Sequence, residues 1–234
     1  MKTLIFIPTY NESGNIERLV RAIFALNPDY HILIVDDQSP DGTAGMVRNM
    51  QKEFAGLALI TRNPPRGRGL AGKDGFMYGL IHKYQILVEM DADFSHNPQT
   101  IPELVEAAQN ADVVIGSRYI LQGTDHSRSK SRRTISIFAN LYIKLLLGLP
   151  VKDCTSGFRA FRYSALQKIN PETLMAKGPE TVEEILYRCH NSGCKIVEIP
   201  IDFFNRETGE SKLHLHVLLS ILFKVLKLRL FSRF

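Results

Sequence analysis

Short apolar runs alternate with helical patterns along the first half of the chain. Residues 3–7 and 32–35 are apolar runs, and the segment between them carries apolar residues at helical spacing after Ser13, a suitable N-cap. We therefore predict an α/β fold with an open, mostly parallel sheet flanked by helices in a single domain. Further helices are expected over 42–54, 69–83, 102–110, 135–147 and 180–189, and further strands over 57–61, 86–90, 113–116 and 195–199.

The composition fits such a domain and limits the kinds of binding partner and cellular compartment that we expect. The chain has 234 residues, of which 44% are hydrophobic and 23% charged, and this excludes a disordered or wholly membrane-embedded protein. Lys and Arg number 29 against 24 Asp and Glu, which favours anionic partners without choosing among phosphates, nucleic acid and acidic lipids. Three cysteines without a C-x-x-C pair favour a reducing compartment, and we expect no secretory signal.

Polar side chains follow four of the expected strands. They are Thr9-Tyr10-Asn11-Glu12, Asp36-Asp37, Asp91-Ala92-Asp93 and Ser117-Arg118. Open α/β sheets bind ligands at the carboxyl ends of their strands, so these side chains are expected to share one site.

Asp91-Ala92-Asp93 is the sharpest of these signals. On an extended backbone, residues i and i+2 point to the same face, so both carboxylates can approach one divalent ion. Hard cations prefer carboxylate oxygens and complete their shell with substrate phosphates. A solvated acidic turn is the alternative, but the position after an apolar strand favours a metal site.

Three other segments allow two interpretations each. Asp36 and Asp37, the first two residues of the segment 36–43, either cap a turn or accept hydrogen bonds from a base or ribose. The glycines of 67–72 match G-x-G-x-x-G but lie in the third strand-helix unit, so we reject a dinucleotide fingerprint; a phosphate loop and close helix packing both remain open. Arg206 and Lys212 lie either in a solvated loop or in a diphosphate clamp.

The histidines show no metal-ligand spacing and no nucleophile partner, so we interpret them as structural or surface residues. On this interpretation, a His96→Ala variant keeps substantial activity.

Together these segments resemble the polyprenol-phosphate mannose synthases, also called dolichol-phosphate mannosyltransferases, in the inverting GT-A class of glycosyltransferases. The resemblance spans nearly the whole chain. Its landmarks are residues 8–12, 36–43, 91–96, 116–119, 153–159 and 209–212. One departure is Ile137-Phe138, where many relatives have Arg-Gly.

The resemblance implies a role for each site residue. The nucleoside would be held by Pro8, Tyr10, Glu12, Val35 and Asp37. Asp91, Asp93 and Ser95 would bind Mg or Mn, with Ala92 beside the sugar nucleotide. Arg118, Arg206 and Lys212 would meet the diphosphate, and Arg132 and Ser136 the lipid phosphate. The catalytic set would be Asp91, Asp93, Arg118 and Arg132.

The implied reaction is transfer of mannose from GDP-mannose to a polyprenyl or dolichyl phosphate with inversion. The alternatives are another GT-A glycosyltransferase, using UDP-glucose or a similar donor with a lipid-phosphate or saccharide acceptor, and an inactive sugar-nucleotide-binding subunit. An NAD-linked oxidoreductase is disfavoured by the misplaced glycines. No nucleic-acid partner is expected, because no recognised module is present.

The C-terminal segment suits a lipid acceptor. We divide the chain into a catalytic domain, residues 1–212, and an amphipathic tail, residues 213–234. Within the domain we expect an acceptor loop at about 120–147, and we expect its stretch 122–133 to be mobile. The longest uncharged run of this tail has 11 residues, too short to span a bilayer. We expect a peripheral protein at the cytoplasmic face of a membrane, with the tail lying flat; core packing and docking on a small membrane subunit are the alternatives.

Overall fold

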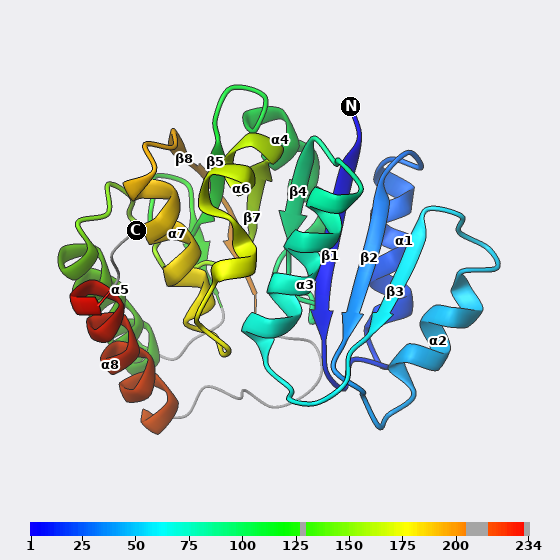
Figure 1. The fold of residues 1–234 in the computed structure, drawn as a ribbon, viewed down its shortest axis with the longest axis horizontal. Coiled ribbons are helices and arrows are strands. Elements are labelled where there is room, and N and C mark those ends of the chain that lie inside the picture. Colours follow the sequence, from blue (N-terminus) through cyan, green and yellow to red (C-terminus); the bar gives the residue numbers. More distant parts are fainter. Residues whose placement is uncertain (127–129, 205–214, 232–234) are drawn as a thin grey trace.

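A seven-stranded sheet forms the centre of the molecule, in the order β3-β2-β1-β4-β7-β5-β8 (Figure 1). The computed structural model describes residues 1–126, 130–204 and 215–231, with the backbone alone at 130–132, 215–219, 221 and 231. The strands of this sheet are β1 (Thr3–Thr9), β2 (His31–Asp36), β3 (Leu57–Thr61), β4 (Ile86–Glu89), β5 (Val113–Ser117), β7 (Arg159–Arg162) and β8 (Ile196–Pro200).

The sheet is mostly parallel, as predicted, with one antiparallel strand. β1 pairs in parallel with β2 and β4, while β7 runs antiparallel to both β4 and β5. No strand was predicted over Arg159–Arg162. The four strands β1, β2, β4 and β5 therefore share a direction, and their carboxyl ends meet at one edge.

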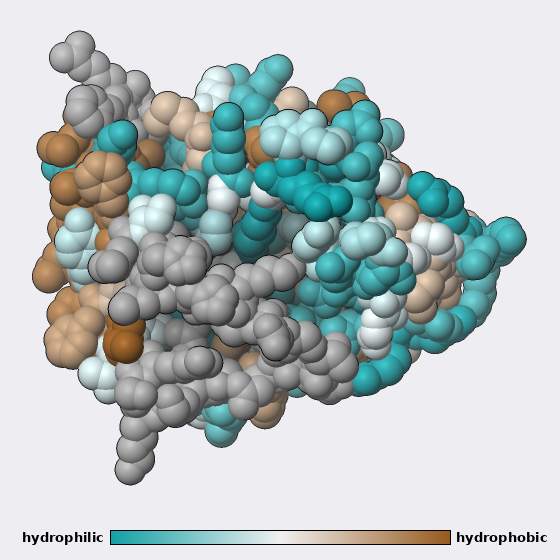
Figure 2. Space-filling view, turned by 90° about the horizontal axis from the view of Figure 1, so that it is seen from below, coloured by the Kyte–Doolittle hydropathy of each residue, from teal (hydrophilic) through white to brown (hydrophobic). Residues whose placement is uncertain are grey.

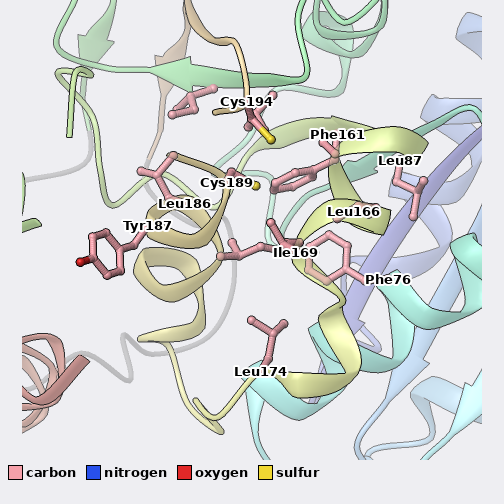
Figure 3. Packing of buried hydrophobic residues seen from close by; sticks show 14 of the residues in the cluster. Phe76, Leu87, Phe161, Leu166, Ile169, Leu174, Leu186, Tyr187, Cys189 and Cys194 are labelled. Carbon is pink, nitrogen blue, oxygen red and sulfur yellow. The ribbon is translucent and has the colours of Figure 1, made fainter. Parts of the chain in front are cut away.

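Helices cover both faces of the sheet, and their apolar faces make two buried clusters. On one face Phe6 of β1 packs edge-on against Phe76, at 4.7 Å between ring centroids, and Phe76 against Phe161 at 5.1 Å (Figure 3). The helices are α1 (Ile16–Leu26), α2 (Thr43–Met50), α3 (Arg68–Ile81), α4 (Ile101–Ala107), α5 (Lys130–Leu147), α6 (Tyr163–Ile169), α7 (Thr181–Asn191) and α8 (Leu215–Phe231).

Helix α3 lies unusually close to the sheet because glycines face it. A Cβ on Gly75 would lie 2.3 Å from Phe6 Cδ2, and one on Gly79 would lie 1.9 Å from Leu87 Cδ2. Both distances are far below van der Waals contact, so larger residues would push the helix outward. The start of α3 is thereby held beside the carboxyl ends of β1 and β4.

A second, two-stranded sheet lies beside this edge. β6 (Thr124–Asp125) pairs in parallel with β9 (Asp202–Phe203), and Phe203 also makes an antiparallel bridge with His96. The short sheet therefore joins three segments that are far apart in the sequence.

Part of the expected mobile loop is helical. The interpretation of 122–133 as a loop is wrong in two places, because β6 occupies Thr124–Asp125 and α5 begins at Lys130. The helix packs on the core through the buried residues Ile143 and Leu147 near its C-terminal end. Its backbone extends from there back to Lys130. Residues 127–129 lie outside the described part of the chain.

The described part of α8 packs on the domain. Val225 is buried in the main core, Lys224 Nζ lies 3.0 Å from Glu180 Oε1, and Arg229 Nη1 donates to the hydroxyl of Tyr187 at 3.1 Å. One face of α8 is therefore packed on the domain, as the core-packed alternative predicts. Within the described residues, none of the helices is long and apolar enough to cross a bilayer. A flat contact between the tail and a membrane stays a prediction.

Candidate functional site at the carboxyl edge of the sheet

The predicted functional segments converge at the edge where β1, β2, β4 and β5 end. Figure 2 views the molecule from this side and shows hydrophilic residues gathered over the strand ends, next to a hydrophobic area at the α5 and α8 end. The convergence was expected from the parallel strands. The contacts within it were not.

Asp37 ties the end of β2 to a basic loop that precedes α3. Its carboxylate accepts hydrogen bonds from Arg62 Nη1 and, at 2.8 Å, from the amide of Gly67. Arg66 Nε donates to the Asp37 carbonyl at 2.9 Å, and Arg66 Nη1 donates to the Tyr10 hydroxyl at 3.0 Å. The Arg66 guanidinium also lies 4.7 Å from the Tyr10 ring centroid, a cation-π distance. The two predicted nucleoside residues, Tyr10 and Asp37, therefore share one polar cluster.

The neighbouring Asp36 has a structural role. It is fully buried and accepts hydrogen bonds from the hydroxyls of Thr9, at 3.1 Å, and Ser39, at 2.6 Å. Of the two interpretations of the adjacent acids, the capped turn therefore holds for Asp36.

The loops after β1 and β2 are joined by a second set of hydrogen bonds. The amide of Glu12 donates to the Thr43 hydroxyl at 3.1 Å, which itself donates to Asp41 at 2.6 Å. Pro8 lies opposite Val35 in the sheet, and the Val35 side chain is part of the core, so a ligand would reach Val35 through its backbone.

Asp91 and Asp93 lie in the turn after β4 and have different surroundings. The Asp91 side chain is 39% exposed and its Oδ1 lies 3.2 Å from Arg68 Nη2, whose other nitrogen, Nη1, lies 3.1 Å from Glu89 Oε1. Asp93 is 5% exposed and its Oδ1 accepts the amide of Ser95 at 3.1 Å. Ala92 between them is buried in the core.

This turn fits a divalent ion only together with a ligand. No group of three or more His, Cys, Asp or Glu side chains within the described ranges could hold a metal. Two carboxylates and a Ser95 oxygen supply hard donors of the kind that Mg²⁺ and Mn²⁺ prefer, and a substrate diphosphate would complete the shell.

His96 closes the same turn from inside. It is 2% exposed, and its Nδ1 accepts the amide of Asp91 at 3.1 Å. Burial lowers the pKa of His96 below its usual value despite the nearby Asp91 and Asp93, which favours the neutral ring that an accepting Nδ1 requires.

The glycine motif at the start of α3 is a packing feature. A Cβ on Gly69 would lie 2.0 Å from Thr181 Oγ1, and one on Gly67 would lie 2.3 Å from the Lys177 carbonyl oxygen. Close packing is therefore the interpretation that holds for Gly67 and Gly69. The polar contacts of this segment come from Arg62 and Arg66 before the motif and from Arg68 within it, and none of the three was predicted as a site residue.

Arg118 is enclosed in a buried ion pair. Its Nε and Nη2 each lie 2.8 Å from one oxygen of Asp153, and Nη2 also donates to Thr155 Oγ1 at 2.7 Å. The side chains of Arg118 and Asp153 are 4% and 0% exposed. Burial alone would raise the pKa of Asp153, but the charge and hydrogen bonds of Arg118 lower it below its usual value. A contact between Arg118 and a diphosphate stays a prediction, and in this structure the guanidinium is already paired.

Only one of the two predicted acceptor side chains is described. The Ser136 hydroxyl on α5 lies 3.1 Å from the hydroxyl of Tyr119, next to Arg118 in the chain. The side chain of Arg132 and the whole of Arg206 and Lys212 lie outside the described residues. Their roles stay predictions.

A buried charged layer lies under the Asp91–Asp93 turn. Arg159, Glu89 and Glu183 are all 5% exposed or less, and among the described residues Arg159 Nε and Glu183 Oε2 have no hydrogen-bond partner. Burial raises the pKa of Glu183 from 4.5 to about 7, although Arg159 and Arg68 oppose the shift.

We expect Glu183→Gln to stabilise the protein at alkaline pH. The folded protein holds the Glu183 proton more tightly than the unfolded chain, so wild-type stability falls as pH rises from 4.5 to about 7. A Gln cannot ionise, and the variant should gain up to roughly 3 kcal/mol over wild type at pH 8 relative to pH 4. Thermal unfolding at both pH values measures this, with the exposed Glu103→Gln as control. Equal pH profiles for Glu183→Gln and wild type would contradict the shift.

The chain matches known proteins over most of its length. The family model of glycosyl transferase family 2 matches residues 4–170. An undecaprenyl-phosphate mannosyltransferase from Micrococcus luteus is 39% identical over 91% of this chain and 88% of its own length. A polyprenol monophosphomannose synthase from Mycolicibacterium smegmatis is 38% identical over 96% of this chain and 85% of its own.

A solved structure confirms the fold. The glucosyl-3-phosphoglycerate synthase of Mycobacterium tuberculosis, in complex with Mn²⁺, UDP and phosphoglyceric acid, superposes with a TM-score of 0.68 over 99% of this chain and 80% of that one, at 18% identity. The resemblance inferred from the motifs is confirmed by the two mannosyltransferase relatives. The chain belongs to glycosyl transferase family 2 and is a glycosyltransferase of the GT-A fold.

Proposed function

We propose that this glycosyltransferase transfers mannose from GDP-mannose to a polyprenyl phosphate, inverts the anomeric carbon and releases GDP. The proposal rests chiefly on the two relatives that are 39% and 38% identical over nearly the whole chain and are named for this acceptor class. The carboxylates of Asp91 and Asp93 at the strand edge are the structural observation that supports it.

The donor would lie along the carboxyl edge. Tyr10 and Asp37 would hold the nucleoside, with the backbones of Pro8, Val35 and Ala92 and the side chain of Glu12 beside it. Asp91, Asp93 and Ser95 would hold Mg²⁺ or Mn²⁺, which when bound neutralises the charge that builds on the departing diphosphate. Arg206 and Lys212 would add positive charge at the same diphosphate.

The acceptor would attack without a dedicated base. A phosphate monoester has its second pKa near 6, so its oxygen is already largely ionised at neutral pH. Arg132 and Ser136 would orient this oxygen in line with the leaving group. The acceptor oxygen forms a bond to the anomeric carbon while the bond from that carbon to the diphosphate oxygen breaks, and GDP takes the electron pair.

The outer faces of α5 and α8 suit a membrane surface. The two helices pack side by side at one end of the molecule (Figure 1), where Figure 2 shows a hydrophobic area. Its large apolar residues are between 37% and 71% exposed, and they are Ile135, Ile137, Phe138, Leu141, Tyr142, Leu145, Phe223 and Leu230. Clustered exposure of this kind marks an interaction surface. We propose that it lies on the cytoplasmic face of the membrane that holds the acceptor, or on a small membrane subunit there.

Replacing Phe138, Leu145, Phe223 and Leu230 by Ser should release the protein from lipid. All four are at least 60% exposed, so the changes should leave folding intact. Each replacement removes the free energy gained when a large apolar side chain is buried in lipid, which is about 1.5–3 kcal/mol for full burial. Sedimentation with anionic vesicles measures the loss. The control is Ile81→Ser/Met175→Ser, which replaces exposed apolar residues outside α5 and α8 and leaves the charge unchanged. Unchanged vesicle binding would contradict a lipid-facing surface.

A donor panel tests the proposed reaction. Radiolabelled GDP-mannose, UDP-glucose and UDP-galactose would each be offered with a polyprenyl phosphate, with and without EDTA. We expect transfer from GDP-mannose alone and its loss with EDTA. Transfer from UDP-glucose instead would support the alternative glycosyltransferase, and no transfer from any donor would support an inactive binding subunit.

A further inference from the structure

The imidazole of His96 is held in a single orientation inside the protein. Its ring is stacked on Phe158 at 4.9 Å between centroids, with an interplanar angle of 13°, and contacts Phe203 at 5.5 Å. With neighbours on the ring and 2% exposure, the imidazole has no room to turn. Its Nδ1 therefore stays where it accepts the Asp91 amide at 3.1 Å.

The turn that His96 closes contains a strained residue. Phe94 has a φ of 58°, the left-handed region that side chains other than glycine rarely adopt. Such a conformation is strained and persists only where the surroundings determine it. The hydrogen bond from Asp91 to His96 spans the whole turn, so it is the contact best placed to hold Phe94 in this conformation.

The other end of the turn is attached to β9. The amide of Phe204 donates to the Ser95 carbonyl at 3.2 Å, and His96 makes its bridge with Phe203. The Phe203 ring also lies 5.2 Å from the guanidinium carbon of Arg118. His96 is thus packed between Phe158, which directly precedes β7, and Phe203 of the two-stranded sheet.

We propose that His96 is a positioning residue, which holds the Asp91–Asp93 turn so that both carboxylates face one divalent ion. The inference rests on the proposed metal site of this glycosyltransferase, since it concerns how that site is shaped. It replaces the sequence-based expectation that His96→Ala keeps substantial activity. His96 acts through the Asp91 backbone and is no ligand itself: Nδ1 accepts the Asp91 amide, and in the neutral ring this places the proton on Nε2, so neither nitrogen offers a lone pair to a metal.

Two variants separate the hydrogen bond from the ring. His96→Phe keeps an aromatic ring between Phe158 and Phe203 but has no acceptor, whereas His96→Asn keeps an acceptor near Nδ1 but has no ring. The matched control is His82→Phe, an exposed histidine at the opposite edge of the sheet. The readouts on the full chain, with saturating GDP and in a parallel series UDP to supply the diphosphate, are Mn²⁺ affinity by electron paramagnetic resonance and hydrogen exchange at the Asp91 amide.

We expect His96→Phe to weaken Mn²⁺ binding by about tenfold or more, as is typical for partners that orient metal ligands. The Asp91 amide should exchange faster by a similar factor, while His96→Asn should restore much of both and His82→Phe should change neither. Equal Mn²⁺ affinity and equal Asp91 exchange in His96→Phe and wild type would overturn the inference and leave the proposed reaction untouched. A wild type that binds no Mn²⁺ would overturn the proposed metal site, and Asp91 exchange would still decide whether His96 holds the turn.

A measurement on the wild type covers the case in which His96→Phe does not fold. Nitrogen NMR of the labelled ring distinguishes the two neutral tautomers. We expect the proton of His96 on Nε2, and a proton on Nδ1 would overturn the inference.

Discussion

Asp93→Asn should lower the rate of sugar transfer by about a thousandfold. An ion that stabilises the leaving diphosphate contributes several kcal/mol to the transition state, and about 4 kcal/mol corresponds to three orders of magnitude in rate. In the wild type the Ser95 amide donates to Asp93 Oδ1 at 3.1 Å. Asn has the shape of Asp and keeps this acceptor oxygen, so the turn should persist. The measurement is single-turnover transfer at saturating donor and Mn²⁺.

Asp29→Asn is the matched control, because Asp29 is an exposed aspartate in a turn at the opposite edge of the sheet. We expect it to have the wild-type rate. If Asp93→Asn also keeps the wild-type rate, while circular dichroism shows both variants folded, then Asp93 holds no catalytic metal. Loss of Mn²⁺ binding in Asp93→Asn with retained transfer would instead show an ion that the reaction does not need.

Asp153→Ala should destabilise the protein by roughly 3–5 kcal/mol, because it leaves the Arg118 guanidinium buried without its counter-charge. For a chain of this size about 1 kcal/mol shifts the melting temperature by 2–4 °C, so a fall of about 10 °C is expected. Differential scanning calorimetry measures it. Glu53→Ala removes the partner of an exposed pair with Arg21 and should change the melting temperature little.

The double variant Arg118→Met/Asp153→Leu separates the two roles of Arg118. Apolar residues of similar size can replace a buried ion pair with little loss, so stability should largely return. If Arg118 only shapes the site, transfer should return with stability. If the family-based prediction is right and Arg118 contacts the diphosphate, the double variant should be stable and slow. A melting temperature for Asp153→Ala within 2 °C of wild type, equivalent to at most about 1 kcal/mol, would contradict the buried pair.

The alternation of apolar strands and amphipathic helices in the sequence was sufficient to predict the sheet, most of its helices and the edge where ligands collect. Those predictions succeeded because strand and helix periods are local properties of the chain. The order of strands was less accessible. β7 lies between β4 and β5 and runs against both, and no local pattern over Arg159–Arg162 distinguishes this insertion from a loop.

The sequence by itself determined that Asp91 and Asp93 follow a buried strand. That both carboxylates face one ion stays a prediction, because the two residues lie in the turn after β4, where Asp91 is 39% exposed and Asp93 only 5%. Only the tertiary structure decided what surrounds them. Arg118 meets Asp153 across 35 residues, and Arg68 meets Asp91 across 23. His96 is enclosed by rings from two other segments. Such contacts depend on which elements the core brings together, and the free energy of burying a charge or a ring is determined by those neighbours.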